Sequence, residues 1–303
     1  MTYTDPAVHR ASLRLLAGRV RAFLWRFQTL GLADRLFSGI DGPCILARRL
    51  FGHRLLVDVA RSNPQRLLFL EGERFLGERR LLRRLLRPGR HAVDVGANIG
   101  YYLLLIESLV GPTGSVSCFE PEPENLAELE RNVRANGFAN VRVTAAAVGA
   151  EEGRVALRLG MNGAVAAAGE GDVTVPLVPL DSALTGPVDF LKIDVEGYEG
   201  FVLTGARRIR REHRPALFVE VHPGFLAPPW TVDGVLAELR ETHPVLEFWE
   251  IAPQRTLAEK VRSRYLGGLG VRRIADSAAL LAACRARRRA EPFWALAPAP
   301  PRS

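Results

Sequence analysis

Cysteine is scarce and scattered in this sequence of 303 residues. The three cysteines, Cys44, Cys118 and Cys284, are far apart and form no CxxC pair. The sequence therefore predicts neither a disulfide framework nor a zinc ribbon. Long hydrophobic runs are also lacking, since no stretch approaches the roughly 18 uninterrupted apolar residues of a membrane span. The first residues show no apolar segment followed by a small-residue cleavage site, so we expect a cytoplasmic protein.

Lysine is nearly absent, and arginine supplies most of the positive charge. Only Lys192 and Lys260 are lysines, yet the formal net charge is +8. Residues 1–90 contain 18 Arg against 7 Asp plus Glu, whereas the remainder contains 23 Lys plus Arg against 26 Asp plus Glu. A basic segment alone is a weak indication of nucleic-acid binding, so we expect no nucleic-acid partner.

The N-terminal third has its own organisation. Apolar residues recur at helical spacing over residues 12–30, with arginines largely off that stripe, which predicts a basic amphipathic helix. This segment could cap the main domain, dock on a partner or contact an anionic membrane surface. Two short strands, 44–50 and 54–60, are expected to join through Gly52-His53. The leucines of "ERRLLRRLLRPGR" then predict a helix that stops at Pro88-Gly89.

From residue 91 the pattern alternates between strands and helices. Seven strands are predicted, at 91–97, 115–120, 141–149, 188–197, 216–223, 245–252 and 293–298. Helices are predicted at 99–110, 123–137, 199–213, 232–242 and 277–289, with a β-rich insertion at 150–180. This order indicates an α/β fold with a mostly parallel sheet covered on both faces. We expect an extension at 1–88, a cofactor-binding domain at 89–297 and a loose tail at 298–303.

The turn after the first strand of this sheet indicates the kind of cofactor. "HAVDVGANIGYY" contains only Gly96 and Gly100, spaced GxxxG, whereas a dinucleotide-binding turn has the pattern GxGxxG that holds a pyrophosphate. A cofactor without phosphates fits better. S-adenosylmethionine (AdoMet) needs backbone clearance at Gly96, its carboxylate can use the first amides of the helix, and its ammonium can use a carbonyl or Asp94.

The second strand ends on an acid that suits an adenosyl ribose. Glu120 follows Gly96 by 24 residues, where a carboxylate can accept hydrogen bonds from both ribose hydroxyls. An NAD enzyme would use the same acid, so an NAD-dependent oxidoreductase stays open as an alternative. A catalytically inactive AdoMet-binding module is the alternative outside enzymes.

Four blocks in order carry a resemblance to a known family. "VDVGANIGYY", "FEPEPEN", "LKIDVEGYEGFVLTGA" and "LFVEVHP" resemble the FkbM family of AdoMet-dependent methyltransferases over about residues 50–297. The resemblance implies a class I methyltransferase fold, with a Rossmann-like sheet of seven strands of which the last is antiparallel. It also implies O-methylation of hydroxyls on sugars or secondary metabolites. The residues it places at the cofactor are Asp94, Gly96, Asn98, Gly100 and Glu120.

Methyl transfer to a hydroxyl also requires that its proton be removed. Asp194 and Glu196 are two residues apart and would project from one face of an extended strand, as would Glu220 and His222. Asp194, Glu196 and His222 are the catalytic candidates, with His222 as the candidate general base and Asp194 as a catalytic or positioning residue. Structural roles stay open for each acid: Asp194 could orient the cofactor, Glu196 could cap the next helix, and Glu220 could pair with Lys192.

A metal site is a further reading of these residues. Asp194, Glu196 and His222 could bind Mg²⁺ or a transition metal, but no spacing makes this specific, and no metal is predicted. The sequence thus predicts an AdoMet-dependent O-methyltransferase whose acceptor is a hydroxyl of a sugar, glycolipid or polyketide-like metabolite. The acceptor's identity and the oligomeric state stay open.

Overall fold

The computed structural model describes residues 37, 40, 42–72, 76–159, 165, 171–251, 271–286 and 291–299. The basic helix predicted at 12–30 and most of the tail predicted at 298–303 lie outside the described residues. No described helix is both long and apolar enough to cross a membrane.

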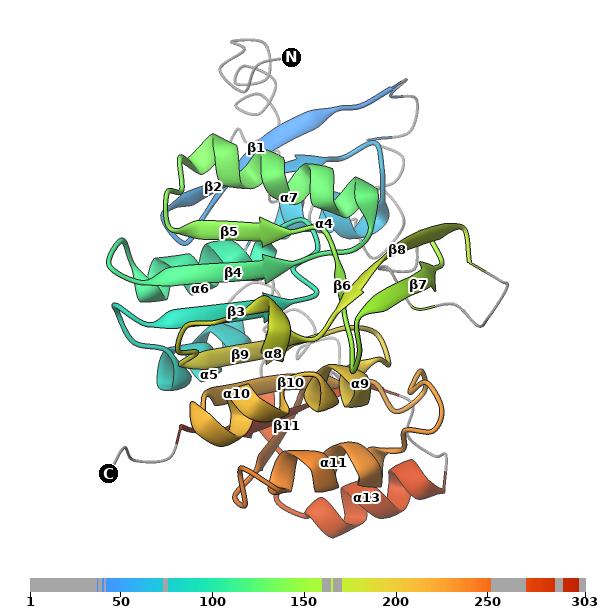
Figure 1. Cartoon of the computed structure of the whole chain (residues 1–303). Coiled ribbons are helices and arrows are strands. Elements are labelled where there is room, and N and C mark those ends of the chain that lie inside the picture. The colour runs from blue at the N-terminus through green and yellow to red at the C-terminus, as the bar shows by residue number, and fades with distance from the viewer. Residues whose placement is uncertain are drawn as a thin grey trace.

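A large mixed sheet forms the centre of the molecule (Figure 1). Its strand order is β12-β11-β13-β10-β9-β3-β4-β5. The strands are β3 (His91–Val95), β4 (Ser115–Phe119), β5 (Val141–Thr144), β9 (Phe190–Ile193), β10 (Ala216–Val221), β11 (Glu247–Ile251), β12 (Val271–Arg273) and β13 (Phe293–Ala297).

The strand directions confirm the expected fold class. From β5 to β10 all neighbours pair in parallel, whereas β13 lies between β10 and β11 and is antiparallel to both. The last of the seven predicted strands is therefore the antiparallel one, as a class I methyltransferase fold requires. The short edge strand β12 was not predicted.

Alternate residues of the central strands pack in two apolar layers. Val93 of β3 and Leu191 of β9 belong to the layer that contacts α9 (Glu199–Thr204), α10 (Arg207–Glu212) and α11 (Val232–Arg240). Ala92 and Phe190 belong to the opposite layer, which contacts α5 (Leu76–Leu85), α6 (Tyr101–Val110) and α7 (Pro123–Asn136). The period of two in each strand thus sets which helix each residue contacts.

The predicted N-terminal hairpin is present. β1 (Ile45–Leu50) pairs antiparallel with β2 (His53–Asp58), and α4 (Asn63–Glu71) follows. The turn is at Phe51-Gly52, one residue earlier than predicted, because these two residues have positive φ (54° and 91°) and His53 already pairs with Leu50. The hairpin is followed by α5, which ends before Pro88-Gly89 as expected.

The strand predicted at 141–149 is divided, which corrects the sequence-based prediction. β5 ends at Thr144, a turn closed by Ala146 N–H donating to Thr144 O (3.0 Å) redirects the chain, and β6 (Ala147–Val148) joins another sheet. That sheet has the order β6-β8-β7, with β7 (Gly153–Leu157) and β8 (Val173–Val178) supplied by the predicted β-rich insertion. The insertion therefore lies beside the carboxyl end of the main sheet (Figure 1).

The helix predicted at 199–213 is also divided, into α9 and α10. The break falls at Gly205, where an added Cβ would lie 1.9 Å from Gly149 O. The main chains of Gly149 and Gly205 are therefore in close contact. Because this contact joins distant residues, the local sequence does not reveal the break. The remaining described helices are α8 (Leu180–Ala183) and α13 (Ser277–Arg285).

Candidate active site

Gly96 forms a tight turn at the carboxyl end of β3. Its φ is +77°, and an added Cβ would lie 1.9 Å from Asp194 O, so a side chain is excluded there. The N–H groups of Gly96 and Ala97 both donate to Phe119 O of β4 (3.0 and 3.1 Å). The turn is therefore held against the ends of β4 and β9 by main-chain contacts, which accounts for the glycine.

Glu120 points from the end of β4 towards this turn. One carboxylate oxygen accepts from Asn98 N–H (2.7 Å) and the other from Glu122 N–H (3.0 Å). Burial raises the pKa of Glu120 to about 7, although the two N–H donors favour the ionised form. Glu120 therefore changes its charge near neutral pH.

A small cavity joins these two features. Gly96 and Glu120 are both in its wall, together with Asp194, which follows β9. The rest of the wall is mainly apolar and is formed by Val95, Phe119, Pro121, Ala146, Ala147, Val148, Leu157, Val165, Val195 and Tyr198. Its volume is about 30 Å³. That volume holds little more than a water molecule, so side chains of the wall would have to move to admit a nucleoside.

The other predicted cofactor residues lie behind this wall. Asp94 is fully buried and accepts from Lys192 Nζ (2.9 Å), and the same Nζ donates to Gly96 O (3.1 Å). Asn98 contributes its main-chain N–H to Glu120. An added Cβ on Gly100 would lie 3.0 Å from Leu129 Cδ1, so Gly100 lets α6 pack against α7. Their contact with a cofactor stays a prediction.

The predicted catalytic side chains converge beside the cavity, but not as an extended strand would place them. β9 ends at Ile193, and Glu196 lies in a turn with φ of +50°. The expectation that Asp194 and Glu196 project from one face of a strand is therefore wrong. They still meet at the imidazole of His222, because His222 Nε2 is 3.9 Å from Asp194 Oδ1 and 3.6 Å from Glu196 Oε2.

His222 is held by an acid that the sequence analysis missed. Its Nδ1 is 2.7 Å from Glu199 Oε1, and Glu199 is fully buried. Burial by itself would lower the pKa of His222, but the hydrogen bond to Glu199 and the negative charges of Glu199, Asp194 and Glu220 raise it to about 9. Glu199 begins α9, 23 residues from His222, and no local pattern links the two.

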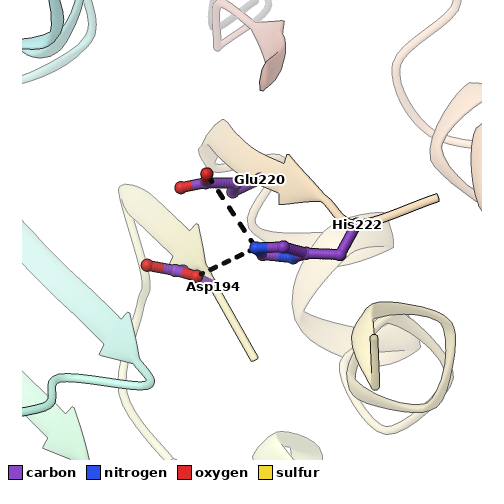
Figure 2. Close-up of side chains that lie close together, drawn as sticks. All are labelled: Asp194, Glu220 and His222. Carbon is purple, nitrogen blue, oxygen red and sulfur yellow. Dashed lines mark ion pairs between the residues drawn. The ribbon is translucent and has the colours of Figure 1, made fainter. Parts of the chain in front are cut away.

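Glu220 is the second acid that was not among the predicted catalytic residues. Its Oε1 is 3.9 Å from His222 Nε2, and its Oε2 accepts from Trp294 Nε1 (3.2 Å). Burial and the neighbouring Asp194 raise the pKa of Glu220 to about 8. The pairing with Lys192 that the sequence left open is not formed, since Lys192 bonds Asp94 instead. Figure 2 shows that Asp194 and Glu220 both face the same nitrogen, Nε2, of the His222 ring.

The tyrosines after the glycine turn pack under the sheet. Tyr101 meets the ring of Phe51 edge-on, and the hydroxyl of Tyr102 bonds the buried Glu78 of α5. Lys192 Nζ lies 4.6 Å from the centre of the Tyr102 ring. Neither tyrosine is part of the cavity wall.

A larger cavity, of about 980 Å³, opens at the opposite edge of the sheet. It is lined by residues near the starts of β3 and β9, including Arg87, Arg90 and Asp189. Some of its charged groups pair with one another, as in the Arg90–Asp189 ion pair (2.9 Å), or bond main-chain carbonyls, as Arg87 does. In folds of this type ligands bind at the carboxyl ends of the strands. We therefore place the candidate site at the smaller cavity.

Comparison with known proteins identifies a domain and several similar folds. The model of the methyltransferase FkbM domain matches residues 94–243. No curated protein matches the chain.

Three solved structures show the range of likeness. Methyltransferase FkbM from Methylobacillus flagellatus KT has 17% identity and a TM-score of 0.41, over 75% of this chain and 56% of that chain. A SAM-dependent O-methyltransferase from Thermotoga maritima has 14% identity and a TM-score of 0.40, over 75% of this chain and 66% of that one. An rRNA methylase from Streptococcus thermophilus has 12% identity and a TM-score of 0.40, over 74% of this chain and 95% of that chain. Likeness at this level carries no information about the acceptor.

Proposed function

Residues 94–243 of this chain form a methyltransferase FkbM domain, and from this premise we propose that the protein transfers a methyl group from AdoMet to a hydroxyl oxygen of a small molecule or glycan. Sugars, glycolipids and polyketide-like metabolites are the acceptor classes that we propose. Nucleic acid is not among them, and an rRNA substrate is an outcome that the acceptor experiment below can detect.

One observation carries this proposal: Gly96 and Glu120 share a cavity with Asp194 at the carboxyl ends of β3, β4 and β9. Gly96 gives main-chain access at the point where AdoMet needs clearance. Glu120 has a buried carboxylate that can accept from two ribose hydroxyls. The apolar walls suit an adenine ring. The chemistry of these residues therefore fits AdoMet, which supplies an electrophilic methyl group when bound, although side chains of the wall must move to admit it.

The protein's own residues have two tasks in such a reaction. They must align the acceptor oxygen with the methyl group, and they must receive the hydroxyl proton. Asp194 is the first candidate for the proton, because it is in the cavity wall and its side chain is 24% exposed. His222 and Glu196 lie next to it. His222, with a pKa of about 9, keeps its own proton near neutral pH and can hold the carboxylate in place.

An exposed aromatic side chain borders this cluster and favours a ring-shaped acceptor. Phe225 is 61% exposed, and its ring centre is 6.5 Å from that of His222. An aromatic face of this kind offers a packing surface for the apolar face of a sugar ring. We propose that Phe225 contacts the acceptor.

The experiment has two steps. Calorimetry with the full chain is expected to show binding of AdoMet and none of NAD, and Glu120→Gln is expected to weaken AdoMet binding about 10- to 100-fold, because a hydrogen bond to a charged group contributes about 1.5–3 kcal/mol. Labelled AdoMet is then offered to sugars, glycolipids, metabolites and RNA. Asp194→Asn and His222→Ala are expected to lower turnover more than AdoMet affinity.

Several results would contradict the proposal. Binding of NAD instead of AdoMet would favour the oxidoreductase alternative. Full AdoMet affinity without turnover on any acceptor would favour a binding module. Methyl transfer to RNA, nitrogen or carbon, identified by NMR of the product, would refute O-methylation of a small molecule or glycan.

A further inference from the structure

Three side chains at the carboxyl ends of β9 and β10 are arranged as the ligands of one ion (Figure 2). Asp194, Glu220 and His222 each offer one ligand atom, and these atoms all lie within 4.8 Å of one another. His222 Nε2 is 3.9 Å from an oxygen of each acid. Such distances are too long for direct hydrogen bonds. They are close to the spacing of about 3 to 4 Å between two atoms that each lie about 2.1 Å from one metal ion.

The orientation of His222 supports the same reading. Its side chain is 6% exposed, and its Nδ1 is 2.7 Å from the buried Glu199 Oε1. Glu199 is fixed in turn by accepting from Gly197 N–H (3.0 Å) with the same oxygen. A metal-binding histidine characteristically donates its other ring N–H to a carboxylate, which fixes the tautomer and aims the free nitrogen at the ion. Here Nε2 is aimed at the acids.

The charge around this cluster favours a cation. Four carboxyl groups lie within 4 Å of the His222 ring nitrogens: Asp194, Glu196, Glu199 and Glu220. Among the described residues Lys192 approaches the cluster, with Nζ 3.6 Å from Asp194 Oδ2, but it makes its hydrogen bond to Asp94. The four carboxyl groups outnumber the two basic side chains, Lys192 and His222 itself, and this excess of acids favours a further cation.

We propose that Asp194, Glu220 and His222 bind a divalent transition-metal ion of the Mn²⁺ type. Two carboxylate oxygens and an imidazole nitrogen suit such an ion better than Ca²⁺, which takes six to eight oxygen ligands. Three protein ligands leave coordination positions open. Asp194 is also in the cavity wall with Gly96 and Glu120, so the ion would lie beside the cavity that we propose for the cofactor. The proposal that the ion binds does not rest on the proposed function. A role of the ion towards an acceptor hydroxyl does rest on it.

The test measures metal binding alone. The full chain is treated with a chelator, dialysed, and titrated with Mn²⁺ in the absence of AdoMet, with electron paramagnetic resonance and calorimetry as readouts. One Mn²⁺ per chain is expected. Asp194→Asn, Glu220→Gln and His222→Ala are each expected to weaken binding more than tenfold. Ca²⁺ is expected to compete weakly.

Matched variants distinguish loss of the proposed metal site from the general effect of removing an acid or a histidine. Glu152→Gln removes an exposed acid and His213→Ala removes a histidine far from the cluster, and both are expected to bind Mn²⁺ as the wild type does. Glu199→Gln leaves all three ligands in place but removes the acid that orients His222, and about a tenfold loss is expected. Electron spin echo measurements are expected to show coupling of Mn²⁺ to a nitrogen, which His222→Ala removes. Circular dichroism and thermal melting report whether each variant folds.

Two results would overturn the proposal. The first is absence of Mn²⁺ binding to folded wild-type protein. The second is binding that the folded Asp194→Asn and His222→Ala variants retain in full. Failure of the proposed function is a separate result. Mn²⁺ binding without AdoMet binding would support the metal site and contradict the proposed function. AdoMet-dependent methylation without Mn²⁺ binding would support the proposed function and contradict the metal site.

Discussion

Glu120 illustrates how burial changes the chemistry of a single residue. Its pKa of about 7 means that the free protein gains the negative charge as pH rises through neutrality. The ionised carboxylate is the form that can accept from both ribose hydroxyls, whereas the protonated form offers fewer acceptors. Its charge, and with it the proposed cofactor contact, therefore depends on pH.

We expect AdoMet affinity to increase about tenfold between pH 6 and pH 8, as the carboxyl group of Glu120 ionises. Glu120→Gln is expected to bind weakly at both pH values, with no such increase. Calorimetric titration at the two pH values checks this. An equal increase in the variant would show that another group is responsible.

Gly96 shows a main-chain constraint that a neighbouring strand imposes. Both its positive φ and the 1.9 Å approach of Asp194 O exclude a Cβ. Gly137 has nearly the same φ, +65°, but nothing lies within 4 Å of an added Cβ. Substitution of Gly137 by alanine therefore costs only backbone conformational energy, whereas substitution of Gly96 adds steric overlap with Asp194.

Gly96→Ala is expected to lower the free energy of unfolding by about 3 kcal/mol or more, because the main chain of Asp194 must shift. Gly137→Ala is expected to cost only about 1 kcal/mol, the conformational term alone. Chemical denaturation measures both. Similar losses in the two variants would show that Gly96 does not need its close contact with Asp194.

At the scale of elements, α7 buries polar side chains beside its apolar ones. Leu129 is buried, and Asn125, Glu128 and Asn132 are buried as well. Asn132 accepts from Leu56 N–H (2.7 Å) and donates to Leu56 O (3.1 Å) and Ile99 O (2.8 Å). One amide side chain of α7 therefore connects the N-terminal hairpin to the turn between β3 and α6.

Asn132→Ala is expected to lower the free energy of unfolding by about 2 to 3 kcal/mol, because it leaves buried main-chain groups of Leu56 and Ile99 without a partner. Asn136 lies one turn later and makes similar bonds to Arg54, but these are exposed. Asn136→Ala is expected to cost less than about 1 kcal/mol, since water replaces the lost bonds. Denaturant titration of both variants checks the difference, and equal losses would contradict it.

Most strands and helices could be predicted because hydrophobic periodicity and glycines mark them locally. The strand at 91–95 and the helix that ends at Gly137 are examples. The two divided elements could not, because contacts with distant parts of the chain decide where each segment goes. After the turn at Thr144, β6 leaves the main sheet and pairs with β8. Gly205, for instance, is constrained by Gly149, 56 residues earlier in the chain.

At the scale of the whole molecule, the excess of positive over negative charge is confined to residues 1–90. Residues 1–90 hold 18 arginines, and the predicted basic helix at 12–30 contributes several of them. Contact of this segment with an anionic membrane surface is a prediction about the full chain. It can be tested because electrostatic attraction to such a surface weakens as the salt concentration rises.

The full chain is expected to float with vesicles that contain anionic lipid at low salt, and to dissociate at about 0.5 M salt, where charges are screened over a few ångströms. A chain without residues 1–36 is expected not to float, and neutral vesicles serve as the control. Equal flotation of the two chains, or none of the full chain, would remove the membrane prediction.

The sequence by itself determined the fold class, the glycine turn and the acid one strand away, because strand periodicity, a tight turn and a fixed helix length are local properties of the chain. It also brought Asp194 and His222 to one edge of the sheet, since parallel strands end together. Only the tertiary structure decided that Asp94 pairs with Lys192 and that Glu199 orients His222. These contacts join residues on different elements, and their distances depend on how sheet and helices pack, which no short stretch of sequence encodes.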